Sequence, residues 1–174
     1  MLNIKINRNF NGVIKILQFI NIDLESEIHR EKVTKFRRDS FKVSFGDEFD
    51  FDEGNYLHWL KGKTIDYPKG FVLVKKNNQY VGQLELSIRE YNDKSIGYVH
   101  LYYLIFEERG KGLGQVLHDY AKKFFKANKI NEFHLRVSPN NTSAIKFYRE
   151  IGMNEIGPEL NGKVIRMKKR FHHL

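Results

Sequence analysis

The clearest alternation of apolar and polar residues lies between Leu101 and Phe125. Its first six residues are all apolar or aromatic, which predicts a largely buried strand over 101–106. The stretch 109–114 then contains three glycines, and after it apolar residues recur with the spacing of a helix. The helical positions are Leu113, Val116, Leu117, Tyr120, Ala121, Phe124 and Phe125. This pattern predicts a strand, a glycine loop and a helix in succession.

A second strand and helix are predicted between residues 131 and 153. Apolar and polar residues alternate over 133–137, as in a half-buried strand. The Pro-Asn-Asn sequence at 139–141 favours a turn and a helix N-cap. Apolar side chains then share one face of the predicted helix, and Gly152 suits its C-terminal end. These side chains are Ala144, Ile145, Phe147, Tyr148 and Ile151.

The remaining segments predict further strands and one or two helices. Alternation in residues 2–20 predicts one or two short strands around an Asn/Gly turn, with a helix over 11–22 as the alternative. One or two amphipathic helices are predicted over 24–45, ended by Gly46. Three more strands follow from runs of apolar and β-branched residues, over 71–75, 80–88 and 163–169. The strand that leads into the glycine loop is predicted to start earlier, over 96–105.

This order of elements predicts the fold class. Consecutive strands joined by short turns, followed by strand, helix, strand and helix, indicate an α+β (mixed α/β) fold with a mixed central sheet. A chain of 174 residues with 41% hydrophobic residues suits a single domain, 1–174, with a sizeable core.

The glycine loop has the chemistry of an anion site. A helix start leaves backbone N–H groups unpaired and carries partial positive charge. Glycines remove the Cβ atoms that would keep a phosphate away from those amides. Arg109 and Lys111 add formal positive charge. The loop therefore predicts a di- or polyphosphate ligand, with a turn-rich segment that binds nothing as the alternative.

Spacing distinguishes among the known phosphate loops. A Walker loop needs Ser or Thr after its lysine, whereas Lys111 is followed by Gly112. A dinucleotide fingerprint needs a third glycine where Gln115 stands. A third pattern, Arg/Gln-x-x-Gly-x-Gly/Ala, is matched by Arg109, Gly112 and Gly114. Here the chain resembles the GNAT superfamily of N-acetyltransferases, whose loop of this form holds the pyrophosphate of acetyl-coenzyme A.

A second motif strengthens the resemblance. Asn141, Ala144, Tyr148 and Gly152 are similar to the family's Asn-x-x-Ala…Tyr-x-x-x-Gly-Phe signature, and they follow the loop by about thirty residues. The resemblance is firm from roughly 70 to 153. It implies a GNAT-like, mostly antiparallel sheet flanked by helices, and a transferase that uses acetyl-CoA as cosubstrate.

The resemblance also implies a role for each motif residue. The backbone of Tyr102, Tyr103 and Leu104 would pair with the pantetheine arm, and Asn141 would be a hydrogen-bond partner on the cofactor side. Tyr148 would be the acid that protonates the departing thiolate, and a phenol near pKa 10 is fully protonated at pH 7. The alternative for Tyr148 is a packed helix aromatic. The loop amides would bind the pyrophosphate, and these are the amides of Arg109, Gly110, Lys111, Gly112, Leu113 and Gly114.

The general base is left open by the sequence. Many relatives place a glutamate on one of two strands, and the corresponding stretches 98–104 and 134–137 contain none. Glu85 and His100 are the candidates on the predicted strands, and ordered water is the third. His100 has a suitable unperturbed pKa near 6.5, although a single strand histidine is more often structural.

The composition of the chain limits which classes of ligand and partner are expected. Without cysteine the chain has no disulfide and no thiolate metal site. Its histidines show no metal-ligand spacing beyond the adjacent pair His172 and His173, so no metal is expected. No apolar run is long enough to span a membrane and no signal-peptide layout is present, so no membrane partner and a cytoplasmic location are expected. The net charge of +9 invites a nucleic-acid partner. The lysines are spread over the whole chain, however, which favours a solvated basic surface that attracts a polyanionic cofactor.

The acceptor is not named by the sequence. Five carboxylates over 47–53 fit an acidic wall for a cationic amine, and a solvated helix start capped by Asp52 is the alternative. The implied function is acetylation of a primary amine on a small-molecule or peptidyl acceptor by direct attack. The alternatives are a catalytically silent, CoA-binding GNAT-fold sensor and a basic nucleic-acid-binding domain. A homodimer is left open beside a monomer.

Overall fold

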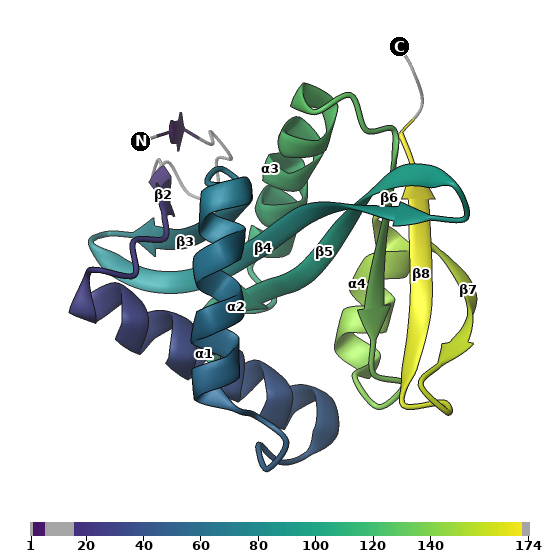
Figure 1. Cartoon of the computed structure of the whole chain (residues 1–174), viewed down its shortest axis with the longest axis horizontal. Coiled ribbons are helices and arrows are strands. Elements are labelled where there is room, and N and C mark those ends of the chain that lie inside the picture. Colours follow the sequence, from purple (N-terminus) through teal and green to yellow (C-terminus); the bar gives the residue numbers. More distant parts are fainter. Residues whose placement is uncertain (1, 6–15, 172–174) are drawn as a thin grey trace.

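The computed structural model describes residues 2–5 and 16–171 (Figure 1). The strands are β1 (Leu2–Lys5), β2 (Ile16–Asn21), β3 (Phe71–Lys76), β4 (Gln79–Tyr91), β5 (Lys94–Leu104), β6 (Glu132–Val137), β7 (Asn154–Glu159) and β8 (Val164–Arg170). The helices are α1 (Glu27–Phe45), α2 (Glu53–Asp66), α3 (Leu113–Ala127) and α4 (Thr142–Glu150), and a short 3-10 turn, η1, covers Phe106–Glu108.

The strands form one mixed sheet in the order β1-β2-β3-β4-β5-β6-β8-β7. The β5–β6 pair is parallel and the other neighbouring strands are antiparallel. Helices α1 and α2 cover one face, and α3 and α4 cover the other (Figure 1). The mixed, mostly antiparallel α+β fold predicted from the sequence is confirmed.

Local sequence signals set several element ends. Gly46 adopts φ +87° and ends α1 as one continuous helix. Asp52 caps α2 by accepting a hydrogen bond from the Asn55 amide at 2.9 Å. Residues 16–21 form a strand and not a helix, while the turn expected between the first two strands lies outside the described residues. Strand β7 was not predicted, because it is a largely exposed edge strand with little apolar alternation.

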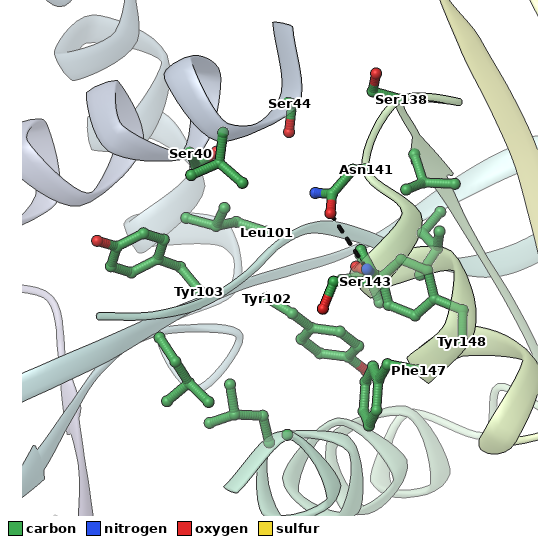
Figure 2. A pocket seen from close by; sticks show the side chains of 18 of the residues that line it. Ser40, Ser44, Leu101, Tyr102, Tyr103, Ser138, Asn141, Ser143, Phe147 and Tyr148 are labelled. Atoms are coloured by element: carbon green, nitrogen blue, oxygen red, sulfur yellow. Dashed lines mark hydrogen bonds between the residues drawn. The ribbon is translucent and has the colours of Figure 1, made fainter. Parts of the chain in front are cut away.

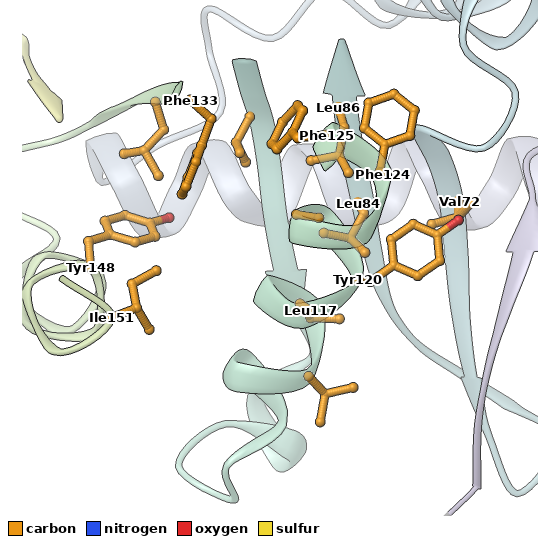
Figure 3. Close-up of a cluster of buried hydrophobic side chains, with 14 of the residues drawn as sticks. Val72, Leu84, Leu86, Leu117, Tyr120, Phe124, Phe125, Phe133, Tyr148 and Ile151 are labelled. Atoms are coloured by element: carbon orange, nitrogen blue, oxygen red, sulfur yellow. The ribbon is translucent and has the colours of Figure 1, made fainter. Parts of the chain in front are cut away.

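Two apolar clusters hold the layers together. The larger lies between the sheet and α3 and α4, with Leu84, Leu86, Phe125 and Phe133 among its buried members (Figure 3). Gly97 is needed there, because a Cβ atom at this position would lie 2.5 Å from the Phe125 ring. The smaller cluster joins the other face to α1 and α2, and its buried members are Ile22, Val33, Phe36, Tyr56, Leu60, Phe71, Leu73, Leu101 and Tyr103.

The two parallel strands pair over only a short length. β5 and β6 are in register from Gly97 to Val99, opposite residues 133–135, and then separate. The β4–β5 ladder is interrupted at the same point, because Leu86 pairs with Val99 and the preceding residue of β4 pairs with Leu101. His100 is therefore an extra residue, a β-bulge, and such bulges bend a strand. The bend lies where the sheet opens.

Candidate functional site

A cavity of about 880 Å³ fills the opening between β5 and β6. Figure 2 looks into it, with Ser40 and Ser44 of α1 on one wall and Asn141 and Tyr148 at the other. We use the term α4 side for the part of the cavity that is lined by α3 and α4. The term α1 side is used for the part that is lined by α1 and by the sheet face under α1. The cavity passes through the sheet and joins the two.

The glycine loop and the start of α3 form one end of the α4 side. Gly112 is the N-cap of α3 with φ +77°, and Gly110 has φ +70°. A Cβ atom added at either glycine would meet no atom within 4 Å, so the space over the loop is open. Because Gly112 has no side chain, the first N–H groups of α3 have no side-chain cap. These are the features of an anion-binding helix start.

The third glycine of the loop has a packing role. A Cβ atom at Gly114 would lie 3.1 Å from the Phe147 ring of α4. Gly114 thus lets α3 and α4 approach each other at the cavity wall, where both residues are part of the lining.

The two basic side chains of the loop are already engaged. Arg109 donates from Nε to the Leu104 carbonyl oxygen at 2.8 Å and from Nη2 to Asp39 of α1 at 3.2 Å. Lys111 lies 3.9 Å from Glu108, which itself pairs with Lys76 at 2.6 Å. Arg109 therefore connects the loop to α1, and the backbone amides are the loop's candidate anion donors.

The end of β5 supplies the floor of the cavity. Its side chains alternate, with Leu101 and Tyr103 packed toward α1 and α2 and with Tyr102 and Leu104 packed toward α3. Because the pairing with β6 ends at Val99, the backbone of residues 102–104 faces the opening. A ligand with amide groups can add to such an unpaired strand edge.

Asn141 is the N-cap of α4. Its Oδ1 atom accepts a hydrogen bond from the Ala144 amide at 3.2 Å, and the side chain lies at the cavity wall (Figure 2). One side of this amide therefore stabilises the helix start, while the other is turned to the cavity.

Tyr148 lies two helical turns after Asn141, on the same face of α4. Its side chain is 9% exposed, and its ring lies 6.4 Å from that of Tyr102 and 5.6 Å from that of Phe147, measured between centroids. Burial raises the pKa of Tyr148, so its hydroxyl group is protonated at neutral pH. The structure thus brings Asn141, Tyr148, the glycine loop and the end of β5 around one cavity.

His100 faces the α1 side. Its Nε2 atom lies 2.7 Å from Ser87 Oγ, and its ring packs against Trp59 with centroids 5.0 Å apart. Burial, and then the positive charges of Arg89 and Arg37, lower the pKa of His100 to about 2. The imidazole is therefore neutral at physiological pH and holds an added proton poorly.

Glu85 lies behind the cavity wall. Its carboxylate is fully buried and accepts hydrogen bonds from Tyr56 Oη at 2.6 Å and from Gln83 Nε2 at 2.8 Å. Arg37, which lines the cavity, donates to the second oxygen at 3.2 Å. Glu85 is thus separated from the cavity by Arg37, and it is not brought beside Tyr148.

The charged side chains of the cavity wall are mostly cationic. They are Arg37, Arg89, Arg109, Arg136 and Lys146, with Glu150 as the carboxylate. The carboxylates over 47–53 are all exposed and are not part of this wall, and Arg38 pairs with Glu53 at 2.9 Å. This stretch is therefore a solvated helix start with Asp52 as its cap, and it does not form an acidic wall of this cavity.

Sequence reasoning missed the basic residues of the α1 side. Arg37 stands among several basic residues of α1 and has no motif around it, and its partner Glu85 is 48 residues away. Arg89 and Arg136 lie on different strands whose register the sequence does not specify.

Metal sites and membrane-spanning helices are both absent from the described residues. Among them, no three His, Asp or Glu side chains gather as a metal site requires. Within the same ranges, no helix combines the length and apolar character needed to cross a membrane.

Solved structures show the same fold at low sequence identity. An acetyltransferase of the GNAT family from Staphylococcus aureus Mu50 has a TM-score of 0.72 at 19% identity, with 90% of this chain and 99% of that chain covered. The PaiA N-acetyltransferase from Thermoplasma acidophilum, solved with coenzyme A, has a TM-score of 0.66 at 20% identity, with 89% and 99% covered. Naa50 from Arabidopsis thaliana, solved with the bisubstrate analogue CoA-Ac-MVNAL, has a TM-score of 0.64 at 17% identity, with the same coverage.

Sequence comparison gives the family directly. No curated protein matches the chain. The sequence profile described as "Acetyltransferase (GNAT) family" matches residues 30–153, which include both motifs and all the elements that form the cavity's α4 side. The chain belongs to the GNAT family of acetyltransferases, which are acyltransferase enzymes.

Proposed function

We propose that the protein transfers the acetyl group of acetyl-CoA to a primary amine, and that Tyr148 is the general acid. The observation that supports this most directly is that one cavity joins the capless start of α3 to the Tyr148 hydroxyl group and continues through the sheet. The residues present fit acetyl-CoA, because the open space over Gly110 and Gly112 suits a pyrophosphate and the free edge of β5 suits an amide-containing arm. The solved relatives with bound coenzyme A or its analogue are consistent with this use.

Residues of α4 serve the leaving-group side of the transfer in this proposal. Bound acetyl-CoA supplies the acetyl group as a thioester, whose carbonyl carbon an amine attacks while the carbon–sulfur bond breaks. The Tyr148 Oη atom holds the proton that the leaving thiolate takes, and its raised pKa keeps that proton in place until the thiolate forms. Asn141 caps the start of α4 and thereby helps to position Tyr148, which lies on the same face of this helix.

In this proposal no side chain of the described residues accepts the proton of the acceptor amine. His100, with a pKa of about 2, is a poor base. Glu85 accepts from three donors, and one of them, Arg37, lies between it and the cavity. The arginines of the α1 side disfavour a bound ammonium ion and so favour the neutral amine, which is the nucleophile. Ordered water is therefore the proton acceptor we propose.

Two measurements test the function. Acetyl-CoA at a hundred times its dissociation constant should stabilise the fold by about 2.7 kcal/mol, and an analogue without the pyrophosphate should do so less. Thiol release with a panel of amines should then identify an acceptor. No thermal shift at millimolar acetyl-CoA would contradict the use of this cosubstrate. A shift without thiol release from any amine would favour the silent CoA-binding module.

A further inference from the structure

Arginine side chains from three strands meet on one open part of the sheet. Gly97 and Val99 of β5 point toward α3, so Tyr98 between them points to the opposite face. Arg89 of β4 lies on this face, with its guanidinium carbon 4.3 Å from the Tyr98 ring centroid. Arg166 of β8 approaches the same ring at 5.8 Å.

Arg136 of β6 completes the group. It lies next to Leu135, which packs in the cluster on the α3 side, so its own side chain points to the opposite face. It is also directly across the β6–β8 ladder from Arg166. Helices α1 and α2 lie over β2 to β5, and no helix formed by residues 2–5 or 16–171 lies over the β6–β8 part of this face (Figure 1). Arg89, Tyr98 and Arg136 line the cavity, so this surface continues its α1 side.

The arginines of this surface are only partly neutralised. Glu159 of β7 pairs with Arg136 and with Arg166, each at 2.5 Å. Arg89 is exposed and has no ion-pair partner in the described part of the chain. Three guanidinium groups thus share the carboxylate of Glu159, and the surface keeps an excess of positive charge at the α1 side of the cavity.

We propose that the acceptor carries an anionic group, a carboxylate or a phosphate, and that Arg89 and Arg136 bind this group on the α1 side of the cavity. The inference rests on the proposed acetyl transfer, because it names the chemical class of the second substrate. Guanidinium groups hold planar oxyanions through paired hydrogen bonds, and an aromatic ring beneath the group restricts its orientation. A polyamine would instead bring further positive charge to a surface that already has an excess.

Matched pairs of amines test this class. Each pair differs by one anionic group: glycine and glycinamide, phosphoethanolamine and ethanolamine, and the dipeptides Ala-Glu and Ala-Gln. Binding to the protein saturated with coenzyme A is measured by titration calorimetry, and thiol release with acetyl-CoA is measured separately. We expect the anionic member of at least one pair to bind about tenfold tighter or more, and the pair that responds identifies carboxylate, phosphate or peptide as the source.

Variants assign the effect to the proposed residues. Arg89→Gln should weaken binding of the anionic member by about tenfold or more, and Arg89→Glu should shift preference toward the neutral member. Arg136→Gln, which leaves Glu159 paired with Arg166, should give a smaller loss in the same direction. Lys123→Gln on the exposed surface of α3 removes the same charge far from the cavity and should change neither affinity.

The outcomes separate this inference from the proposed function. Arg89-dependent binding of anionic amines without thiol release would support the ligand class and contradict acetyl transfer. Thiol release at equal rates from both members of every pair would support acetyl transfer and overturn the ligand class. Equal binding within all pairs, together with Arg89-dependent binding of an RNA oligonucleotide, would overturn the inference in favour of a nucleic-acid surface.

Discussion

The rings of Tyr102 and Tyr148 lie 6.4 Å apart, centroid to centroid, on the α4 side of the cavity. Burial raises the pKa of both hydroxyl groups. The Tyr102 hydroxyl is enclosed and has no hydrogen-bond partner among the described residues. Two phenols therefore stand at one wall, and we propose the acid role for the one on α4.

Replacing these two tyrosines separately tests that assignment. Tyr148→Phe keeps the ring and removes the proposed acid, so kcat should fall about 10²- to 10⁴-fold while acetyl-CoA affinity changes little. Tyr102→Phe removes the neighbouring hydroxyl and should lower kcat less. Steady-state kinetics beside acetyl-CoA titration measure both effects. Equal losses in the two variants, or full activity of Tyr148→Phe, would leave Tyr148 as a packing residue.

The glycine loop can be tested with a matched control. Gly112→Glu places a side chain and a negative charge in the open space over the α3 start, and acetyl-CoA should then no longer raise the melting temperature. Gly162, in the turn before β8, also has a positive φ and open space around it, and it does not line the cavity. Gly162→Glu should therefore cost similar backbone strain and keep the thermal shift. Loss of the shift in both variants would point to unfolding and not to the loop.

Asn141 has two separable roles in this structure. Asn141→Ala removes the helix cap and should lower the free energy of unfolding by about 1 kcal/mol, whereas Asn141→Ser retains a capping oxygen. Both variants remove the amide nitrogen. If Asn141 also contacts the cosubstrate, acetyl-CoA affinity should fall in both, while urea unfolding detects the loss of stability only in Asn141→Ala. Unchanged affinity in both would leave Asn141 as a cap alone.

His118 should make the fold sensitive to acid. It is buried on α3, neither ring nitrogen has a partner among the described residues, and burial lowers its pKa to about 4. In the unfolded chain the histidine pKa is near 6.5. Between pH 4 and pH 6.5, therefore, the unfolded state binds a proton at His118 that the folded state does not bind. The contribution to stability is therefore complete above pH 6.5 and is lost as the pH falls toward 4, by on the order of 2 kcal/mol at pH 5.

Urea unfolding at pH 7 and pH 5 measures this loss. In His118→Leu the decrease between the two pH values should be smaller by that amount, although His100, whose pKa is also lowered, still contributes in the same direction. His58→Leu, at an exposed position on α2, is the control and should retain the full decrease. An unchanged pH dependence in His118→Leu would contradict the assignment.

Features set by neighbouring residues could be predicted from the sequence. Three such features are the Asp52 cap of α2, the glycines at the end of α1 and the start of α3, and the apolar face of α3. Each depends on residues within a few positions of one another. The glycine loop and the helix after it could be predicted for the same reason, because the three glycines lie within one short segment.

Features set by distant residues could not be predicted. Arg109 was expected to add charge to the loop, but Asp39, 70 residues earlier, holds its side chain on α1. The sequence places Glu85 on a strand as a candidate base, but it does not show that α1 and α2 bring Arg37 and Tyr56 against its carboxylate. Such pairings depend on where the helices pack on the sheet, and a local sequence pattern does not specify this packing.

The extra residue in β5 has a consequence for how this chain tolerates change in length. His100 is surplus to the β4–β5 ladder, since Val99 and Leu101 pair with consecutive residues of β4. Deleting residue 100 would leave every remaining side chain on its present face and would remove the bend that precedes the opening. We therefore expect the shortened chain to fold with β5 running further alongside β6, where the cavity now is. One residue of strand length separates a continuous sheet from a sheet with room for a substrate.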